Sequence, residues 1–401
     1  MPIPRKRTRA LLIAAGMAVS LGAVVNAPAQ AAAQRDVLLV GNSASGTVSF
    51  LDGRTFQNLG SINIVPDLQE RLDGMNPVEK AAYEVVKSEE GGDRFADDVY
   101  VSPDGTKLYV SRGNLNDSVA FDIKTKQMLW RFKGAGFKSD HAVLSPDGTR
   151  FTVSATTAGK AQVIDTATGK LAAEFATGTY PHANDYSPDG KYLYNSSIGV
   201  TALPQALEGL KGARQITVVD PKTFKVTKTY TFDHGVRPAA FTRDNRLAYL
   251  QLSYLNGFAE FSLVTGKITR TVQMPFSAAG RALKPDDYPN NSAHHGMAIN
   301  GDESRLCDVG TIDDYTAIIA RPLLNTTGTV TYDTGSIPYW STTSVDGQHC
   351  FVSLSGRNAI SVIDYRTARE VARIPVGTFP QRERLGKVPQ DVLDSLSPAA
   401  G

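Results

Sequence analysis

Cysteine is scarce in this chain, and the common catalytic motifs are missing. Only Cys307 and Cys350 occur among 401 residues, which excludes a disulfide-dense scaffold and any zinc or iron–sulfur site built from several cysteines. The sequence contains no Gly-x-Ser-x-Gly elbow, no phosphate-binding P-loop and no Cys-x-x-Cys-His haem attachment. The usual sequence signatures of serine hydrolases, nucleotide-binding proteins and c-type cytochromes are therefore absent.

An excess of charge is missing as well. The chain has 42 basic and 40 acidic residues, and residues 1–33 hold four of the basic ones and none of the acidic ones. Without that segment the net charge is −2. Proteins that bind nucleic acid usually carry a strongly basic face, so we expect no nucleic-acid partner.

The beginning of the chain has the pattern of an export signal. Basic residues at positions 5, 6, 7 and 9 precede an apolar run over 10–25, which is short for a membrane span, and small residues follow. We expect a signal peptide over 1–33, cleaved near Ala31 or Ala33, and a secreted product, extracellular or periplasmic, without a stable membrane anchor. An uncleaved anchor is the alternative.

A repeated turn is the strongest positive signal. Ser-Pro-Asp-Gly occurs at 102–105, 145–148 and 187–190, and weaker versions that keep aspartate third occur at 242–245, 300–303 and 344–347. Proline presets φ, aspartate bonds its own backbone and glycine accepts positive φ, so each copy predicts a tight turn. A second turn with a fixed threonine alternates with the first, at 52–55, 122–125, 165–168, 220–223, 262–265 and 364–367. Together the two sets define seven units.

The spacing of these turns predicts the fold. Successive first turns are 43, 42, 55, 58 and 44 residues apart, which fits four short strands per unit with occasional insertions. We therefore expect an all-β, seven-bladed β-propeller of four-stranded antiparallel blades over 35–388, with a helical insertion at 67–93 and a tail at 389–401. Residues 37–65 should give three strands of the first blade, and the stretch after Phe379 its innermost strand. Residues 381–388 are polar for such a strand.

The same motifs carry a resemblance. Ser-Pro-Asp-Gly-x-x-Leu-Tyr-Val at 102–110 and Val-Ile-Asp-x-x-Thr-Gly at 163–169 resemble YVTN-type (YncE-like) propeller repeats, across nearly all of 35–388. Such repeats occur in binding proteins, cytochrome-like enzymes and lactonases, so the resemblance implies the fold without implying one function. Pro181-His182 and Gly235-Val236-Arg237-Pro238 are similar to channel motifs of seven-bladed lactonases. That likeness implies a base at His182 and an oxyanion or carboxylate contact at Arg237, although Pro238 replaces the histidine usual in that group.

Residues four to six before each first turn should surround one opening of the channel. This ring comprises Asp97, Asp98, Asp140, His141, His182, Arg237, His294, His295, Tyr339, Trp340 and, by its match to the Gly-Thr-Tyr-Pro segment at 178–181, Gln381. It holds four of the six histidines, a residue type that binds metals and transfers protons near neutral pH. The ring predicts a functional site. The alternative is that some of these histidines only bond within their blades.

Three insertions should lie at the same end as the ring. They are residues 67–93, 199–214 and 275–291. The first has the signature of a helix, with Asn76 as N-cap, Pro77 in the first position, Glu79 completing a capping box and Gly91 near the end. Long loops on a rigid scaffold are where recognition is usually built.

Three functions are compatible with the ring. The first, by a narrow margin, is binding of a small or polymeric anionic or sugar-like ligand by a monomer. The residues expected to bind it are Asp97, Asp98, Asp140, His294, Tyr339, Trp340 and Gln381. The second is a divalent transition metal on some of His141, His182, His294 and His295, with Asp140 or Asp97 as carboxylate partner. The third is a hydrolase or lyase that uses His182, Arg237 and His141.

The two cysteines fall on second strands of consecutive blades, with opposite side-chain parity. That parity would point Cys307 and Cys350 at each other across one blade interface. Because packed sheets lie about 10 Å apart, we expect two free buried thiols, with a disulfide as the alternative.

Overall fold

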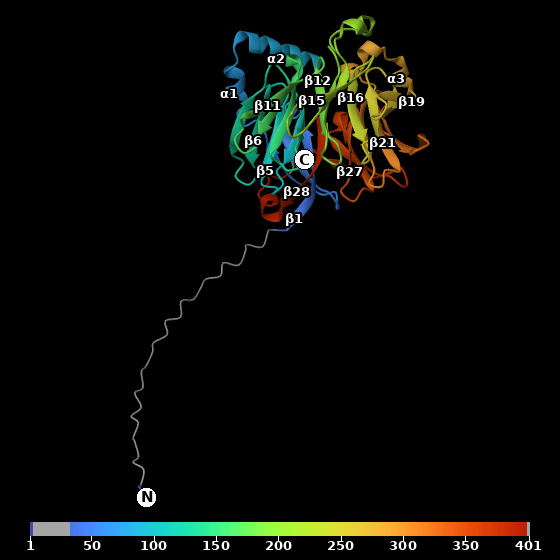
Figure 1. Ribbon diagram of the computed structural model, residues 1–401. Coiled ribbons are helices and arrows are strands. Elements are labelled where there is room, and N and C mark those ends of the chain that lie inside the picture. Colours follow the sequence, from blue (N-terminus) through green and yellow to red (C-terminus); the bar gives the residue numbers. More distant parts are fainter. Residues whose placement is uncertain (3–32, 399–401) are drawn as a thin grey trace. The chain divides into compact units, whose positions relative to one another are not determined.

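Seven four-stranded sheets surround a central channel in the computed structural model, which describes residues 1–2 and 33–398 (Figure 1). Every pairing within these sheets is antiparallel. The predicted seven-bladed propeller is confirmed. Nearly all of the predicted signal segment, residues 3–32, lies outside the described residues.

The strands follow one another blade by blade along the chain. The first blade holds β1 (Gln34–Asn42), β2 (Thr47–Asp52) and β3 (Asn58–Asn63), completed by β28 (Pro380–Pro389). The next three contain β4 (Asp98–Val101), β5 (Lys107–Arg112), β6 (Asp117–Asp122), β7 (Met128–Lys133), β8 (Ser139–Leu144), β9 (Arg150–Ala155), β10 (Lys160–Asp165), β11 (Leu171–Ala176), β12 (Pro181–Tyr186), β13 (Leu193–Ser197), β14 (Gln215–Val219) and β15 (Val226–Thr231). The last three contain β16 (Val236–Phe241), β17 (Leu247–Leu252), β18 (Gly257–Ser262), β19 (Lys267–Gln273), β20 (His294–Ile299), β21 (Arg305–Gly310), β22 (Tyr315–Ala320), β23 (Asn325–Thr331), β24 (Pro338–Thr343), β25 (His349–Leu354), β26 (Ala359–Asp364) and β27 (Arg369–Pro375).

The propeller is closed by its two ends, as predicted. β28 pairs with β1 from Gln34 opposite Pro389 to Asn42 opposite Pro380, and so becomes the innermost strand of the first blade. The chain continues into the short helix α4 (Gln390–Leu393), and Ser397 bridges back to Ser61 of β3. Both ends of the described chain therefore belong to one blade.

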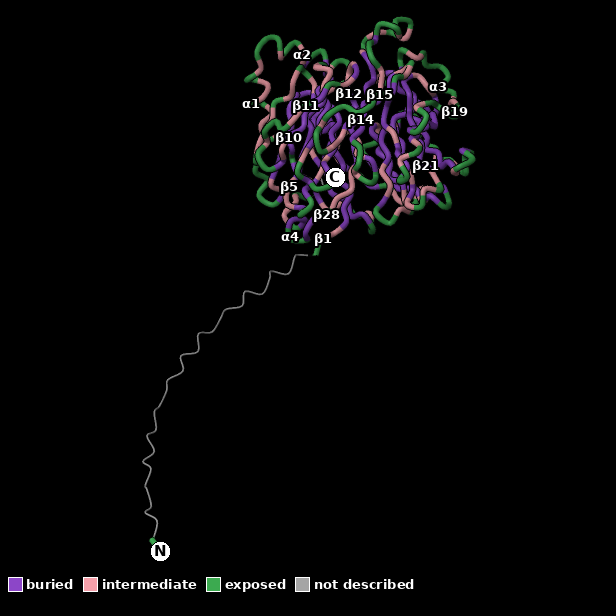
Figure 2. The backbone as a smooth tube through the Cα atoms, in the orientation of Figure 1, coloured by how far each residue is buried: buried purple, intermediate pink, exposed green. Residues whose placement is uncertain are grey.

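Burial follows the position of each strand in its blade (Figure 2). Middle strands such as β6 and β22 are buried almost throughout, because neighbouring blades cover both of their faces. Outermost strands such as β7 alternate between intermediate and exposed residues. Valine, leucine, isoleucine and phenylalanine of adjacent blades pack in these interfaces, and the burial of that apolar surface is the main source of stability.

The repeated first turns lie at one end of the channel, which we call the lower rim. In all six, the carboxylate accepts a hydrogen bond from the side chain two residues earlier and from the backbone N–H two residues later. The hydroxyl of Ser145 and the backbone N–H of Thr149 thus lower the pKa of Asp147. These aspartates are Asp104, Asp147, Asp189, Asp244, Asp302 and Asp346. Each one serves its own turn.

The insertions lie at the opposite end, the upper rim, where α2 (Pro77–Glu89) and α3 (Ala278–Ala282) are seen in Figure 1. α2 begins at the predicted capping box of Asn76 and Glu79, and α1 (Leu68–Asp73) precedes it. The other insertions form η2 (Gln205–Leu210), η3 (Pro285–Asp287) and η4 (Pro289–Asn291). Short 3-10 turns η1 (Thr156–Ala158), η5 (Thr311–Asp313) and η6 (Ser355–Arg357) follow second strands. Among the described residues, no helix is long and apolar enough to cross a bilayer.

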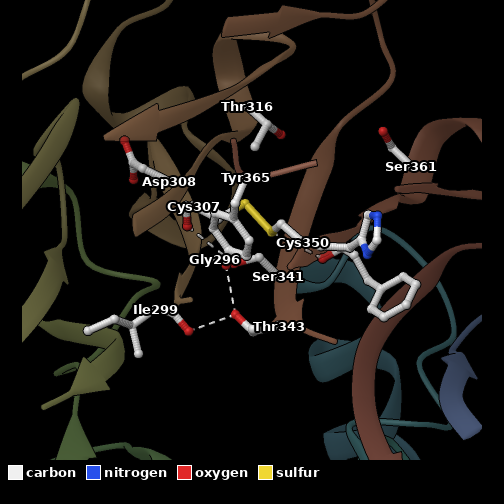
Figure 3. The surroundings of a disulfide bond; sticks show 12 residues. Gly296, Ile299, Cys307, Asp308, Thr316, Ser341, Thr343, Cys350, Ser361 and Tyr365 are labelled. Atoms are coloured by element: carbon white, nitrogen blue, oxygen red, sulfur yellow. Dashed lines mark hydrogen bonds between the residues drawn. A yellow bond between two sulfur atoms is a disulfide. The ribbon is translucent and has the colours of Figure 1, made fainter. Parts of the chain in front are cut away.

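The two cysteines form a disulfide, so the expectation of free thiols is wrong (Figure 3). Cys307 of β21 and Cys350 of β25 lie in adjacent blades with their Cα atoms 6.5 Å apart. The separation of about 10 Å between packed flat sheets does not apply there, because blades converge toward the channel. Thr343 fastens the same interface by donating to the carbonyl of Ile299 at 2.8 Å.

Candidate functional site

Bulges at the start of the innermost strands position the ring residues. The pairing register shifts near the beginning of five innermost strands, between residues 139 and 142, 181 and 184, 236 and 239, 294 and 297, and 338 and 341. A bulge bends its strand and re-aims the side chains within it, and bulges are common beside active sites. The residues inside these five are Asp140, His141, His182, Ala183, Arg237, Pro238, His295, Gly296, Tyr339 and Trp340. A sixth register shift, in the pairing of β28 with β1, frees Gln381.

A cavity of about 350 Å³ lies between these innermost strands and α2. Its polar lining comes from the ring and from the loops above it: Glu89, Glu90, Asp97, Lys138, Asp140, Thr156, Thr157, Tyr180, His182, Thr201, Arg237, Asn290, Tyr339, Gln381 and Arg382. Its apolar lining consists of Val78, Ala81, Ala82, Val85, Val86, Phe137 and Ile198. The cavity thus places titratable groups opposite an apolar helix face.

Three imidazoles from three blades meet next to this cavity. One nitrogen from each of His141, His182 and His295 lies within 4.8 Å of the others, and all three side chains are buried. The Nε2 atoms of His182 and His295 are 3.3 Å apart. The ring of His295 also stacks on Tyr339, with centroids 4.1 Å apart. Propeller closure therefore brings together histidines separated by up to 154 positions in the sequence.

Hydrogen bonds fix the protons of two of these rings. Nδ1 of His182 lies 3.0 Å from the Asp140 carboxylate, an acceptor, so this nitrogen donates and Nε2 keeps its lone pair. Nε2–H of His295 then donates to that lone pair. Burial lowers the pKa of His182 and, further, that of His295, so both rings are neutral. The result is a buried chain from Asp140 through His182 to His295.

The third ring is held by an arginine. Nε of Arg382 donates to Nδ1 of His141 at 2.6 Å, so the proton of this neutral imidazole lies on Nε2, which has no partner among the described residues. Burial, together with the charge of Arg382, lowers the pKa of His141 well below its usual value. The backbone carbonyl of Asp97 lies 3.1 Å from the same Nδ1.

The carboxylates of the cavity differ in protonation. Burial would raise the pKa of Asp140, but the charge of Lys138 and the hydrogen bond from His182 hold it well below its usual value. Lys138 is itself paired with Glu90. Burial raises the pKa of Asp97 to about 8, and its Oδ2 is unpartnered within residues 33–398. At neutral pH Asp140 is an anion, whereas Asp97 is mostly a neutral acid.

Below the imidazoles the channel is filled by stacked and paired side chains. The guanidinium carbons of Arg382 and Arg384 lie 4.2 and 5.0 Å from the Trp340 ring centre. Arg384 forms a bidentate ion pair with Asp98: Nε donates to Oδ1 at 2.9 Å and Nη2 donates to Oδ2 at 2.8 Å. Asp98 and Trp340 therefore form the floor beneath the cavity and do not line it.

Most of the predicted ring residues converge, and one lies apart. Asp97, Asp140, His182, Arg237, Tyr339 and Gln381 all line the cavity. His294 points into its blade interface, where Nδ1 contacts Asp308 at 3.1 Å and Nε2 contacts Asn256 at 2.9 Å. Both of its nitrogens are occupied, so it serves the packing of the blades.

Sequence reasoning missed the cations that surround the imidazoles. Arg382 and Arg384 come from β28, and Lys138 immediately precedes β8. The sequence did contain a signal for Arg382 and Arg384. Residues 381–388 are unusually polar for an innermost strand, and charged residues on such a strand indicate contacts inside the channel. Nothing in the sequence marked Lys138.

The imidazole cluster fits a metal ion in part. A tetrahedral ion with bonds of about 2.0–2.1 Å separates its nitrogen ligands by about 3.3 Å, the spacing of the His182 and His295 Nε2 atoms. Asp140 bonded to Nδ1 of His182 is a typical outer partner of a metal-binding histidine. Nε2 of His295 fits only after its proton moves to Nδ1, which has no partner among the described residues. His141 fits only after Arg382 leaves its Nδ1, because Nε2 must then offer its lone pair. The group could hold a divalent transition metal through His141, His182 and His295.

Comparisons with known proteins support the fold. The sequence matches no family model and no curated protein. A solved structure of hydrazine synthase from Kuenenia stuttgartiensis is similar with a TM-score of 0.55 and 16% identity, covering 71% of this chain and 88% of that one. Dihydro-heme d1 dehydrogenase NirN, solved in complex with DHE, is similar with a TM-score of 0.56 and 13% identity, covering 93% and 79%. At such low identity the likeness extends to the propeller fold alone.

Proposed function

We propose that the protein binds a small organic anion in the upper cavity, between Arg237 and Arg382. The observation that carries this proposal is that both guanidiniums are buried there without a carboxylate partner within residues 33–398. Arg237 contacts the hydroxyl of Ser253 and the carbonyl of Asn290. Arg382 contacts His141, its neighbour's carbonyl and the Trp340 ring.

Two other cations of the chain show the contrast. Arg112 pairs with Asp117 and Asp67, and Arg384 pairs with Asp98. Burial alone would lower the pKa of Arg112, yet these acids raise it. For Arg237 and Arg382 burial prevails, and the pKa of each is lowered. A buried charge without a counterion is costly, and a bound anion would supply the missing partner.

Hexanoate is a suitable probe for calorimetric titration. We expect Arg237→Gln and Arg382→Gln each to weaken its binding about 10–100-fold, because a hydrogen bond to a charged group contributes about 1.5–3 kcal/mol. Arg246→Gln, an exposed arginine of the lower rim, is the matched control and should bind as the parent does. Equal affinity of all four proteins, or no binding of any carboxylate, would refute the proposal.

A metal-dependent hydrolase or lyase is the second candidate, favoured by the converging imidazoles. A divalent transition metal on His141, His182 and His295 would supply Lewis acidity and an activated water. The residues themselves would exclude bulk water, and Asp140 would keep the His182 proton on Nδ1. Elemental analysis of protein purified without chelator should then find about one equivalent, and much less in His182→Ala. Absence of metal from both would eliminate this candidate.

A metal-free lactonase-like reaction would use the same cavity. His182 would act as a base oriented by Asp140, with Arg237 facing a developing oxyanion. Loss of lactone turnover in both His182→Ala and Arg237→Ala would favour it over simple binding. A saccharide ligand is less well supported, because Trp340 lies under Arg382 rather than in the cavity lining.

We also propose that this chain is an exported, monomeric member of the YVTN-type propellers. The disulfide between Cys307 and Cys350 supports export, because such bonds persist in oxidising compartments. The repeated turns and the seven blades support the family relationship. Mass determination of the secreted protein would test the cleavage near Ala31 or Ala33, and its elution volume would test the monomer.

A further inference from the structure

One face of α2 is apolar and lines the cavity. The residues at 78, 81, 82, 85 and 86 follow the i, i+3, i+4, i+7, i+8 spacing of a single helix face, and all of them line the cavity. Val78 is 64% exposed and Val85 is 57% exposed. Tyr83 holds the helix down on a different side, by packing against Phe95 and Leu115. Val86, at the end of this stripe, is buried, whereas Val78 and Val85 remain open to the cavity.

The wall across the cavity continues this apolar surface. Phe137, which is 40% exposed, precedes β8, and the buried Ile198 follows β13. The two residues belong to different blades from α2, yet they line the same cavity. A ligand that enters beneath α2 would therefore touch apolar groups on two sides.

The opposite end of the cavity is polar and cationic. Arg237 and Arg382 are each 1% exposed and lack a carboxylate partner among the described residues. Lys138, which also lines the cavity, is paired with Glu90. Of the acids around Arg382, Asp98 is paired with Arg384 at 2.8 Å and Asp140 contacts Nδ1 of His182 at 3.0 Å. Polarity thus changes along the cavity, from the buried guanidiniums of Arg237 and Arg382 at one end to the exposed valines of α2 at the other.

We propose that the ligand is an amphiphilic carboxylate, with its charged head at Arg237 and Arg382 and its apolar body along α2. This inference rests on the proposed anion site and adds the class of ligand. A volume of about 350 Å³ holds roughly ten groups of the size of water or methylene, at about 30 Å³ each. An aliphatic or aromatic body of roughly five to eight carbons fits beside the carboxylate.

A chain-length series tests the proposal. Titrations with acetate, butyrate, hexanoate and octanoate should show affinity rising about fourfold per methylene, because each buried methylene contributes about 0.8 kcal/mol. Octanol, which has the same body without the charge, should bind at least tenfold more weakly than octanoate. Both trends are needed, since the first reports the apolar wall and the second the guanidiniums.

Variants of α2 locate the apolar contact. Val78→Ser combined with Val85→Ser should flatten the dependence of affinity on chain length and weaken octanoate binding more than acetate binding. Val371→Ser is the matched control, because Val371 is 52% exposed on the outer strand β27. Equal affinity along the series, or an unaltered slope in the α2 variant, would overturn the amphiphile proposal and leave the anion site standing. Absence of binding for every carboxylate would instead refute the anion site itself.

Discussion

The two rims of the channel use aspartate in opposite ways. At the lower rim, Asp147 accepts hydrogen bonds from its own turn, which lower its pKa and satisfy its carboxylate. At the upper rim, Asp97 keeps an unpartnered oxygen among the described residues and has its pKa raised to about 8 by burial. The lower rim repeats one self-contained unit six times, whereas the upper rim has a different pair of residues in each blade.

The comparison suggests a division between the rims, with groups that stabilise the fold at the lower rim and groups proposed to bind a ligand at the upper rim. Groups that satisfy each other locally contribute to folding wherever they are placed. Groups that remain unpaired in a buried site cost stability, and proteins tolerate that cost mainly where a ligand can relieve it. Four predictions test whether this division between the rims is real.

Loss of the disulfide should have the largest effect on stability and none on binding. Cys307→Ser with Cys350→Ser should lower the free energy of unfolding by about 2–4 kcal/mol, because the bond closes a long loop in the unfolded chain. Urea titration would measure this, and hexanoate affinity measured on the folded variant should match the parent. A change in affinity above threefold would show that the scaffold and the site are coupled.

A lower-rim turn should show the next largest loss. Asp147→Ala removes bonds from Ser145 and Thr149 and should destabilise the protein by about 1–2 kcal/mol, again without altering ligand affinity. Thr125 lies in a second turn of another blade, where its hydroxyl donates to Asp122 at 2.9 Å. The stability of Thr125→Ala would show whether the other repeated turns also contribute to folding. If Asp147→Ala were neutral in urea titration, the lower rim would not be the structural end.

The upper rim should respond with the opposite sign. Arg237→Met replaces a buried charge without an acidic partner by an apolar chain of similar length, so stability should stay equal or rise by about 1 kcal/mol while anion binding is lost. The same urea titration in ligand-free buffer would measure it. A loss above 2 kcal/mol would mean that Arg237 is a structural residue.

Between the rims, Asp185 should give the most specific effect, a pH dependence. Burial raises its pKa to about 7, opposed by Arg384. The folded protein therefore keeps a proton that the unfolded chain releases above about pH 4, so this contribution to stability is complete below pH 4 and is lost as the pH rises to 7. Asp185→Asn should gain stability relative to the parent as the pH rises from 4 to 7, by at most about 4 kcal/mol for a shift of about three pKa units. Parallel unfolding curves of the two proteins at all pH values would contradict this.

The fold could be predicted because its determinants are local. Ser-Pro-Asp-Gly at 145–148 specifies a turn by its own chemistry, and its recurrence counts the blades. The ring around His182 could also be located, because each member stands at a fixed distance before such a turn. The disulfide could not, since the sequence does not give the distance between converging blades.

The composition of the site was harder to predict than its place. His294 and His295 are adjacent, and only the bulge at the start of β20 decides which of them reaches the cavity. Lys138 and the apolar face of α2 reach the cavity through tertiary packing, which the pattern of turns does not predict. Arg382 depends on the alignment of β28 with β1, which joins segments more than 340 positions apart.

That last alignment has a consequence for how the protein is made. The strand that carries Gln381 and Arg382 is the last one among residues 33–398, and the cavity is lined by residues from position 78 to position 382. A nascent or truncated polypeptide that stops before β28 would lack one of the two guanidiniums and the wall beside it. Binding at the proposed anion site would therefore require β28 to be in place.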